Sequence, residues 1–128
     1  MPQPPELTPL VGCTVGRLTL DYQVGLLLAS QGPGEVYAAR VSAFLTIGGT
    51  FQLTRAGHAQ VVTPDDTDNY QATVGLLHAS VMDARIGTDE SLTMAFSGDQ
   101  LLHVPRDPAF ESWEIQGRGV RGWLAGPL

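Results

Sequence analysis

Three histidines are the first side chains in this chain whose type suits metal or acid–base chemistry. His58, His78 and His103 are separated by 20 and 25 residues, and no H-x-H or H-E-x-x-H pair occurs. Histidine ligands for zinc usually come in such short-range pairs. The histidine spacing therefore predicts no metal site.

An acidic run at residues 65–69, DDTDN, partly resembles a calcium-binding loop. Such a loop needs a bidentate glutamate at its twelfth position, and the twelfth residue counted from Asp66 is Leu77. Acidic side chains also complement the positive end of a helix, and Thr67 or Asp68 can cap one. We therefore interpret the run as the start of a helix.

The glycine-rich segment GRGVRG at 117–122 fits the dinucleotide-binding spacing G-x-G-x-x-G. That motif works only between a strand and a helix whose N-terminus binds the pyrophosphate. Only WLAGPL follows Gly122 in this chain, which is too short for such a helix. The segment predicts a glycine-rich turn, and the sequence as a whole predicts no cofactor.

Other catalytic residue types are scarce. The chain contains no lysine, which excludes Schiff-base chemistry and a phosphate-loop lysine. Cys13 is the only cysteine and is expected to be a small buried residue. No G-x-S-x-G motif surrounds any serine. The sequence predicts no catalytic residue.

Glu111 and Glu114 are the remaining candidates for acid–base work. A strand is expected to start at Phe110, and residues three apart on a strand point to opposite faces. Glu111 is then expected to share a face with Trp113, while Glu114 lies on the other face. The two carboxylates are therefore not expected to face one substrate without a bulge, and we expect Trp113 to be a core residue.

The overall composition argues against some classes of function. The chain has 128 residues, 43% of them hydrophobic, and a formal charge of −6, which is typical of one globular domain. A negative charge argues against nucleic-acid binding, which needs a concentrated basic face. No apolar run is long enough for a membrane span. We expect a cytoplasmic protein with no nucleic-acid or membrane partner.

The chain is expected to form mainly strands, because apolar and polar residues alternate over short stretches. We predict a mainly β fold, an antiparallel sandwich or a partly closed barrel of about eight or nine short strands. One short helix is expected near 69–78, and Ala56–Gly57 is expected to form a hairpin turn. Residues 1–10, with four prolines, are expected to be an extended arm on a single domain at 11–128. The predicted strands cover 17–23, 25–30, 35–47, 50–55, 58–63, 80–87, 91–96, 100–104 and 110–116.

The C-terminal quarter of the chain resembles a family of small bacterial β domains of unknown function. The resembling run is LTMAFSGDQLLHVPRDPAFESWEIQG at 92–117. Its hallmark, aromatic-E-x-W-E-hydrophobic-x-G, is matched by Phe110, Glu111, Trp113, Glu114 and Gly117. The chain departs from the family at Ser97–Asp99, where the family has Asp-Gly, and after Gly117. The resemblance implies the β fold and assigns no activity.

The hypothesis that these observations favour is a non-enzymatic protein-interaction module, such as an immunity-like or accessory protein. Its candidate contact face is acidic and comprises Asp65, Asp66 and Asp68, which suits a basic partner. The alternative is a small-molecule-binding domain, or an enzyme whose site is assembled from dispersed residues. A third hypothesis is a homodimer that pairs through an edge strand. The residues considered for the dispersed site are Arg55, His58, Glu111 and Trp113.

Overall fold

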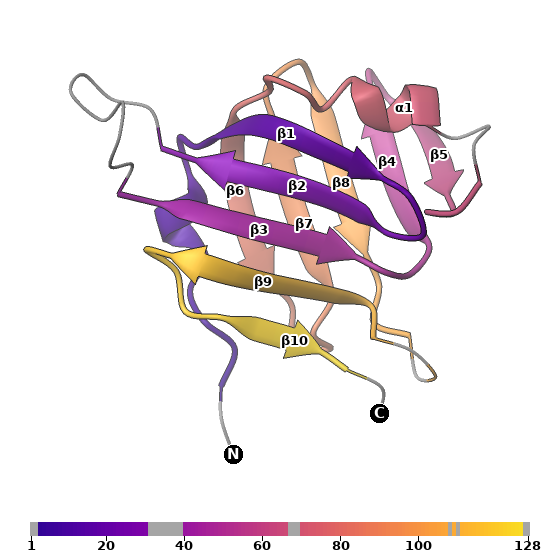
Figure 1. Cartoon of the computed structure of the whole chain (residues 1–128). Helices are drawn as coiled ribbons and strands as arrows, with labels where there is room; N and C mark the ends of the chain where they lie inside the picture. Colours follow the sequence, from indigo (N-terminus) through magenta and orange to yellow (C-terminus); the bar gives the residue numbers. More distant parts are fainter. Residues whose placement is uncertain (1–2, 31–39, 67–69, 108, 110, 127–128) are drawn as a thin grey trace.

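The computed structural model describes residues 3–30, 40–66, 70–107, 109 and 111–126. Within these residues, ten strands form two antiparallel sheets of five strands each, which pack against one another (Figure 1). The predicted mainly β fold is confirmed. The described strands form a sandwich-like pair of sheets and no closed barrel.

The first sheet, called sheet A, has the strand order β1-β2-β3-β9-β10. Its strands are β1 (Thr14–Leu20), β2 (Val24–Ala29), β3 (Ser42–Ile47), β9 (Trp113–Arg118) and β10 (Trp123–Ala125). The second sheet, called sheet B, has the order β5-β4-β8-β7-β6. Its strands are β4 (Phe51–Arg55), β5 (His58–Val62), β6 (Val81–Ile86), β7 (Leu92–Phe96) and β8 (Gln100–Val104).

Alternation of side chains along the strands produces the core. In β3, Ala43, Leu45 and Ile47 are fully buried, whereas the residues between them are only partly buried. Successive side chains on a strand point to opposite faces, so one face of each sheet faces the other sheet. The largest buried side chains in this layer include Trp113 and Phe51.

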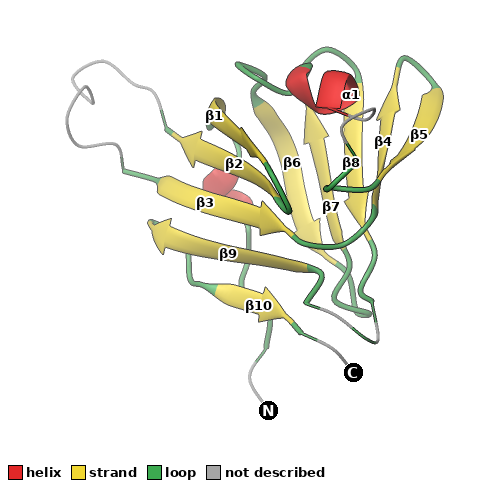
Figure 2. Cartoon of the chain, turned by 45° about the vertical axis from the view of Figure 1, so that its right-hand side comes forward, coloured by secondary structure: helices red, strands yellow, loops and turns green. Residues whose placement is uncertain are grey.

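The two sheets are joined at one corner, where β1 and β6 begin. An isolated bridge links Thr14 and Ser80, and the Val15 N–H donates to the Ala79 carbonyl at 2.9 Å. The strands of sheet A cross those of sheet B at a steep angle (Figure 2), as in orthogonally packed sheets. This corner leaves β10 and β5 as the outer strands of the two sheets.

The β4–β5 hairpin turns through Ala56 and Gly57, as the sequence predicts. Both residues have positive φ angles, 51° and 81°, which is the pattern of a two-residue type I′ turn. Such a turn matches the right-handed twist of the flanking strands, which explains why an alanine is accepted in the left-handed region.

Three segments differ in extent from the predictions. The short helix α1 spans Tyr70–Val74, whereas a helix near 69–78 was expected; Gly75 to His78 form turns instead. Within the expected extended arm, Thr8–Leu10 form a 3-10 turn with Pro9 in its first positions. Leu7 and Leu10 are buried, so their side chains attach this segment to the core. No helix in the described residues is long and apolar enough to cross a membrane.

The strand predictions match β1 to β9 in order, with larger shifts at three starts. β1 spans Thr14–Leu20, three residues earlier than the expected strand 17–23. β3 begins at Ser42, and residues 35–39 of the expected strand 35–47 lie outside the described residues. β9 begins at Trp113, after the expected start at Phe110, which also lies outside them. The additional strand β10 was not predicted, because it is only three residues long and follows a glycine-rich turn.

Candidate functional site

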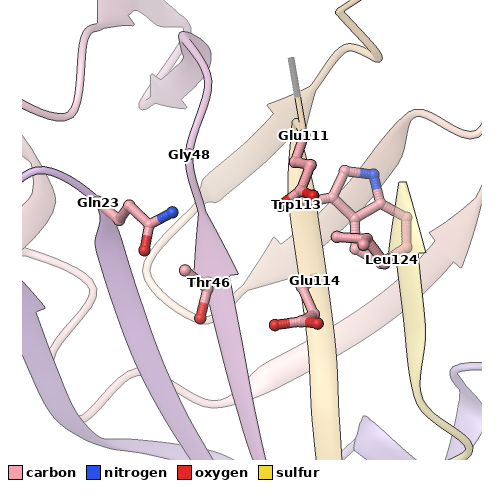
Figure 3. A pocket seen from close by; sticks show the side chains of 7 residues that line it. All are labelled: Gln23, Thr46, Gly48, Glu111, Trp113, Glu114 and Leu124. Atoms are coloured by element: carbon pink, nitrogen blue, oxygen red, sulfur yellow. The ribbon is translucent and has the colours of Figure 1, made fainter. Parts of the chain in front are cut away.

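A small polar cavity opens on the outer side of sheet A, at the end where β3 ends and β9 begins (Figure 3). Its volume is about 110 Å³. We call it the acidic pocket, because two carboxylates line it and no lysine or arginine does so among the described residues. Its lining residues are Gln23, Thr46, Gly48, Glu111, Trp113, Glu114 and Leu124.

Pairing between strands places three of these residues in one row. Thr46 of β3 lies opposite Glu114 of β9, and Glu114 lies opposite Leu124 of β10. Residues directly opposite in adjacent strands share a face of the sheet, and Trp113, one residue earlier, points into the core and is 1% exposed. The row therefore belongs to the outer face of sheet A.

Turn residues complete the pocket. Gln23 lies in the turn between β1 and β2, and Gly48 directly follows β3. A Cβ atom at Gly48 would lie 3.0 Å from the Glu111 carbonyl oxygen and 3.3 Å from the Gln23 amide nitrogen. Glycine at position 48 thus allows the two flanking segments to approach each other.

The structure corrects the prediction that Glu111 and Glu114 face opposite ways. Both line the acidic pocket, because Glu111 precedes β9 and so does not follow the alternation of that strand. The Ser112 carbonyl accepts hydrogen bonds from the N–H groups of Gly48, at 3.0 Å, and Gly49, at 3.3 Å. These bonds fix the chain where it enters β9.

The carboxylates of Glu111 and Glu114 differ in exposure, and among the described residues neither forms an ion pair with an arginine. Glu111 is exposed and Glu114 is partly buried. In the part of the chain that the structure describes, the ion pairs are those of Arg85 with Asp83 and Arg106 with Glu90. Neither pocket glutamate therefore forms an ion pair with another described side chain.

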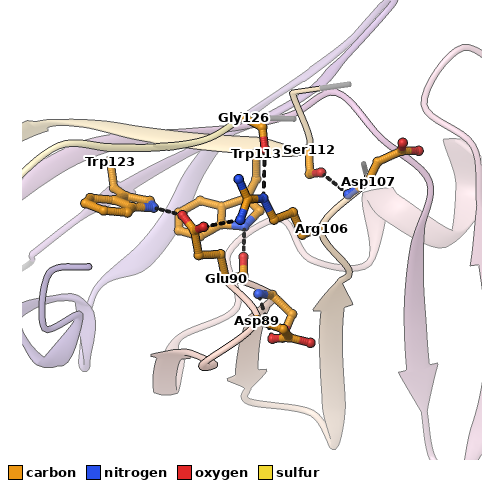
Figure 4. A network of polar contacts seen from close by, with 9 residues as sticks. Asp89, Glu90, Arg106, Asp107, Ser112, Trp113, Trp123 and Gly126 are labelled. Carbon is orange, nitrogen blue, oxygen red and sulfur yellow. Dashed lines mark hydrogen bonds and ion pairs between the residues drawn. The ribbon is translucent and has the colours of Figure 1, made fainter. Parts of the chain in front are cut away.

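Trp113 is part of a polar network on the inner side of this end of the sandwich (Figure 4). Its indole N–H donates to the Glu90 carbonyl at 2.9 Å, and the Trp123 indole N–H donates to the Glu90 carboxylate at 3.1 Å. Arg106 forms an ion pair with the same carboxylate and donates to the Gly126 carbonyl at 2.8 Å. The network connects β9 and β10 to the turn before β7.

Three short-range hydrogen bonds stabilise the loops beside this network. The Ser112 hydroxyl accepts the Asp107 N–H at 2.6 Å, within the loop that leads to Glu111. The Asp89 carboxylate accepts both the N–H and the hydroxyl of Ser91, at 3.0 and 2.6 Å. The two hydrogen bonds from Ser91 hold the pKa of Asp89 below its ordinary value, and the bond from the hydroxyl is the larger cause.

Arg55 and His58 lie elsewhere, at the β4–β5 hairpin, where they are opposite each other. They line a separate hollow of about 360 Å³. The Arg55 guanidinium donates to the Gln100 side chain at 2.9 and 2.6 Å and to the Ala72 carbonyl at 2.8 Å. Arg55 therefore holds α1 against sheet B, and this pair lies in a different hollow from Glu111 and Trp113.

The predicted acidic face is described in part. Asp65 and Asp66 are exposed and lie in and beside the turn after β5, while Asp68 lies outside the described residues, as does the other predicted cap, Thr67. Four residues after Asp66, the Tyr70 hydroxyl donates to the Asp21 carbonyl at 3.4 Å. This bond connects α1 to the turn that contributes Gln23 to the acidic pocket.

The histidines occupy separate places. His103 Nδ1 forms a hydrogen bond with the Thr93 hydroxyl at 3.0 Å, and His78 is exposed with a φ of 69°. Among the described residues, no three of the histidine, cysteine, aspartate and glutamate side chains gather as metal ligands would.

The glycines of GRGVRG allow close contact between strands. Gly117 lies opposite Ala43 with a φ of 146°, and a Cβ atom there would lie 2.3 Å from the Ser42 carbonyl oxygen. Gly119, with a φ of 87°, approaches the Arg40 carbonyl in the same way, at 2.5 Å. The segment is where β9 ends beside β3, and its glycines are needed for that approach.

Sequence reasoning missed most of the residues around the acidic pocket. Gln23, Thr46 and Leu124 carry no motif, and they meet only because β2, β3 and β10 are neighbours of β9 or of one another. Glu90 and Arg106 were missed for the same reason. Trp123 was the one available signal, since a tryptophan close to a strand end usually finds a partner for its indole N–H.

Comparison with known proteins gives a family and no activity. The model of a family described as "Family of unknown function (DUF6188)" matches residues 7–127 of this chain. No curated protein and no solved structure matches it.

Proposed function

Since this chain belongs to the DUF6188 family, whose function is unknown, we propose that it is a non-enzymatic protein-interaction module. The acidic pocket binds one basic side chain of a partner protein. The observation that carries this proposal is a cavity lined by two carboxylates, Glu111 and Glu114, with no basic side chain among its lining residues.

The size of the pocket favours a side chain over a metabolite. Small-molecule sites usually measure about 300–1,000 Å³, and the acidic pocket measures about 110 Å³. A single arginine or lysine side chain needs only a small depression with acceptors for its N–H groups. The pocket therefore suits recognition of one residue on a larger partner.

The lining residues suit both parts of a basic side chain. The carboxylates of Glu111 and Glu114 and the oxygens of Gln23 and Thr46 are acceptors for its N–H groups. Leu124 is 43% exposed at the rim and offers an apolar surface to the methylene stem. Gln23 and Thr46 lie on one side of the pocket, and the two glutamates lie on the other (Figure 3).

The charge of the whole chain supports the same kind of partner. A formal charge of −6 accelerates encounter with a basic protein, and Asp65 and Asp66 add exposed acidic groups. We place the module in the bacterial cytoplasm as an immunity-like or accessory protein. The partner that we propose for the acidic pocket is a basic protein.

A titration with a blocked arginine tests the pocket directly. In ¹⁵N NMR spectra, N-acetyl-arginine methylamide is expected to shift the amide signals of Thr46 and Glu114 in a saturable way. Blocked norleucine, which lacks the charge, is expected to leave them in place. The double variant E111Q/E114Q should abolish the arginine response, because it removes both charges and keeps the shape of the side chains.

A charge-matched control separates the pocket from the overall field. The double variant D83N/D99N removes the same charge from residues outside the pocket lining and should respond like the wild type. An equal arginine response in all three proteins would contradict the proposal. With the pocket established, capture from lysate by wild type and not by E111Q/E114Q identifies the partner.

A second candidate function is small-molecule binding at the β4–β5 hollow. Its volume of about 360 Å³ lies within the range of ligand sites, and His58 lines it. A thermal-shift screen of metabolites tests this candidate. A stabilising compound whose effect is lost in H58A would support it, whereas an effect that persists in H58A would place binding elsewhere.

A further inference from the structure

The outer edge of β5 lacks the features that usually protect an edge strand. β5 reads HAQVV, and four of its five residues are exposed. It contains no proline, lysine or bulge, which are the usual means of preventing a further strand from pairing. Of the other terminal strands, β1 and β6 each contain a register irregularity and are linked to each other by a bridge at one end, and β10 is only three residues long. Irregular register and short length both limit pairing. Among the described terminal strands, β5 therefore has neither kind of protection.

The hydrogen-bonding pattern identifies which backbone groups of β5 point outward. The Ala56 N–H donates to the Asp99 carbonyl at 3.1 Å, so the even-numbered positions at this end of β4 face β8. The odd-numbered positions, such as Leu53, then face β5, and Leu53 lies opposite Gln60. Directly opposite residues alternate between bonded and non-bonded pairs. The N–H and carbonyl groups of Ala59 and Val61 therefore point away from β4.

We propose that β5 pairs antiparallel with β5 of a second copy of this chain. A register centred on Gln60 places Ala59 of each copy opposite Val61 of the other. This register uses every outward N–H and carbonyl of Ala59 and Val61 in both copies, in about four hydrogen bonds between the chains. Sheet B becomes continuous across the two copies, around a two-fold axis.

Side-chain chemistry at this edge suits a second copy. The net charge of −6 opposes contact between two copies where carboxylates meet, and β5 contains no carboxylate. On the outer face of sheet B, Val61 lies in a row with Gln52 and His103, and Ala59 lies in a row with Thr54 and Leu101. The join is therefore between uncharged faces, and Val61, 61% exposed, packs against Ala59 of the second copy.

This surface lies on sheet B, whereas the acidic pocket lies on sheet A, so dimerisation goes beyond the proposed function and is tested independently of it. The variant E111Q/E114Q keeps β5 intact and should dimerise like the wild type. A loss of arginine binding without a loss of dimerisation separates the two proposals.

Sedimentation velocity of the whole chain, from about 10 µM to about 1 mM, is the first test. The apparent mass is expected to rise from 13.6 kDa towards twice that value. V61P should weaken dimerisation about tenfold or more, because it removes one outward N–H from each copy. V61T keeps the N–H and the β-branched shape and should dimerise within about threefold of the wild type. A monomer throughout this range would overturn the proposal.

Amide hydrogen exchange gives a readout that does not depend on a variant's folding. The N–H groups of Ala59 and Val61 are expected to exchange rapidly at low concentration and to become protected as concentration rises. The N–H of Gln60, which faces β4, should be protected at every concentration. A dimer that leaves the Ala59 and Val61 amides unprotected would place the interface elsewhere and would overturn this one.

Discussion

The indole N–H of Trp113 donates to the backbone carbonyl of Glu90 at 2.9 Å, although the two residues are 23 positions apart. Trp113 is 1% exposed, so its N–H needs a partner inside the protein. The Glu90 carbonyl accepts this hydrogen bond, and the Glu90 backbone has a φ of 63°. The Glu90 carboxylate accepts a hydrogen bond from the Trp123 indole N–H and forms an ion pair with Arg106. Glu90, in the turn between β6 and β7 of sheet B, thus links that turn to β9 and β10 of sheet A.

Removing the Glu90 carboxylate should destabilise the fold. E90A is expected to lower the free energy of unfolding by about 1–3 kcal/mol, because the partly buried Trp123 indole loses its acceptor and the partly buried Arg106 loses its ion pair with Glu90. E90Q keeps an acceptor for Trp123 and should lose less. Urea unfolding measures both, with E6A at an exposed position as the control. A loss in E90A no larger than in E6A would contradict the structural role of the network.

Glycine is expected to be favoured at position 75 because the Arg55 side chain lies close to it. A Cβ atom at position 75 would lie 2.4 Å from the Arg55 guanidinium, which is hydrogen-bonded to Gln100 and Ala72. G75A is expected to cost about 1 kcal/mol by displacing that group. In an R55M background the same change should be neutral or slightly stabilising, because alanine restricts the unfolded chain.

Thermal or urea unfolding of the four proteins of this double-mutant cycle measures the coupling. Equal costs of G75A in both backgrounds would show that Arg55 and Gly75 do not interact.

Gly117 should tolerate no side chain. G117A forces a Cβ atom to 2.3 Å from the Ser42 carbonyl oxygen, at a φ of 146°. We expect a loss of about 3 kcal/mol from strain and displacement of β3. The matched control is G16A, where nothing lies within 4 Å of the added carbon. Similar midpoints of unfolding for G117A and G16A would refute the close approach of β9 to β3.

Asp89 should make stability depend on acid pH. Hydrogen bonds from Ser91 lower its folded-state pKa below the ordinary 3.8, so this contribution to stability is complete above that value. It is lost as pH falls below 3.8 through the lower folded-state pKa. Carboxyl NMR titration should find the Asp89 pKa below 3.8 in the wild type and closer to it in S91A, which lacks the hydroxyl donor. An unchanged pKa in S91A would exclude that cause.

The class of fold and the order of its strands could be predicted from local patterns in the sequence. Alternation of apolar and polar residues identified β1 to β9, because a strand exposes one face to the core and one to solvent whatever its neighbours are. The Ala56–Gly57 turn was predictable for a similar reason, since a two-residue hairpin needs a particular local geometry. These features depend on a few consecutive residues.

The contacts between residues far apart in the sequence could not be predicted in this way. Glu111 and Glu114 share one pocket because β9 starts at Trp113 and the preceding residues leave the strand, a boundary that local pattern does not fix. Glu90 meets Trp113 and Trp123 because sheet A packs over the edge turn of sheet B. Such contacts depend on which strands become neighbours, and that is decided by burial of the whole core.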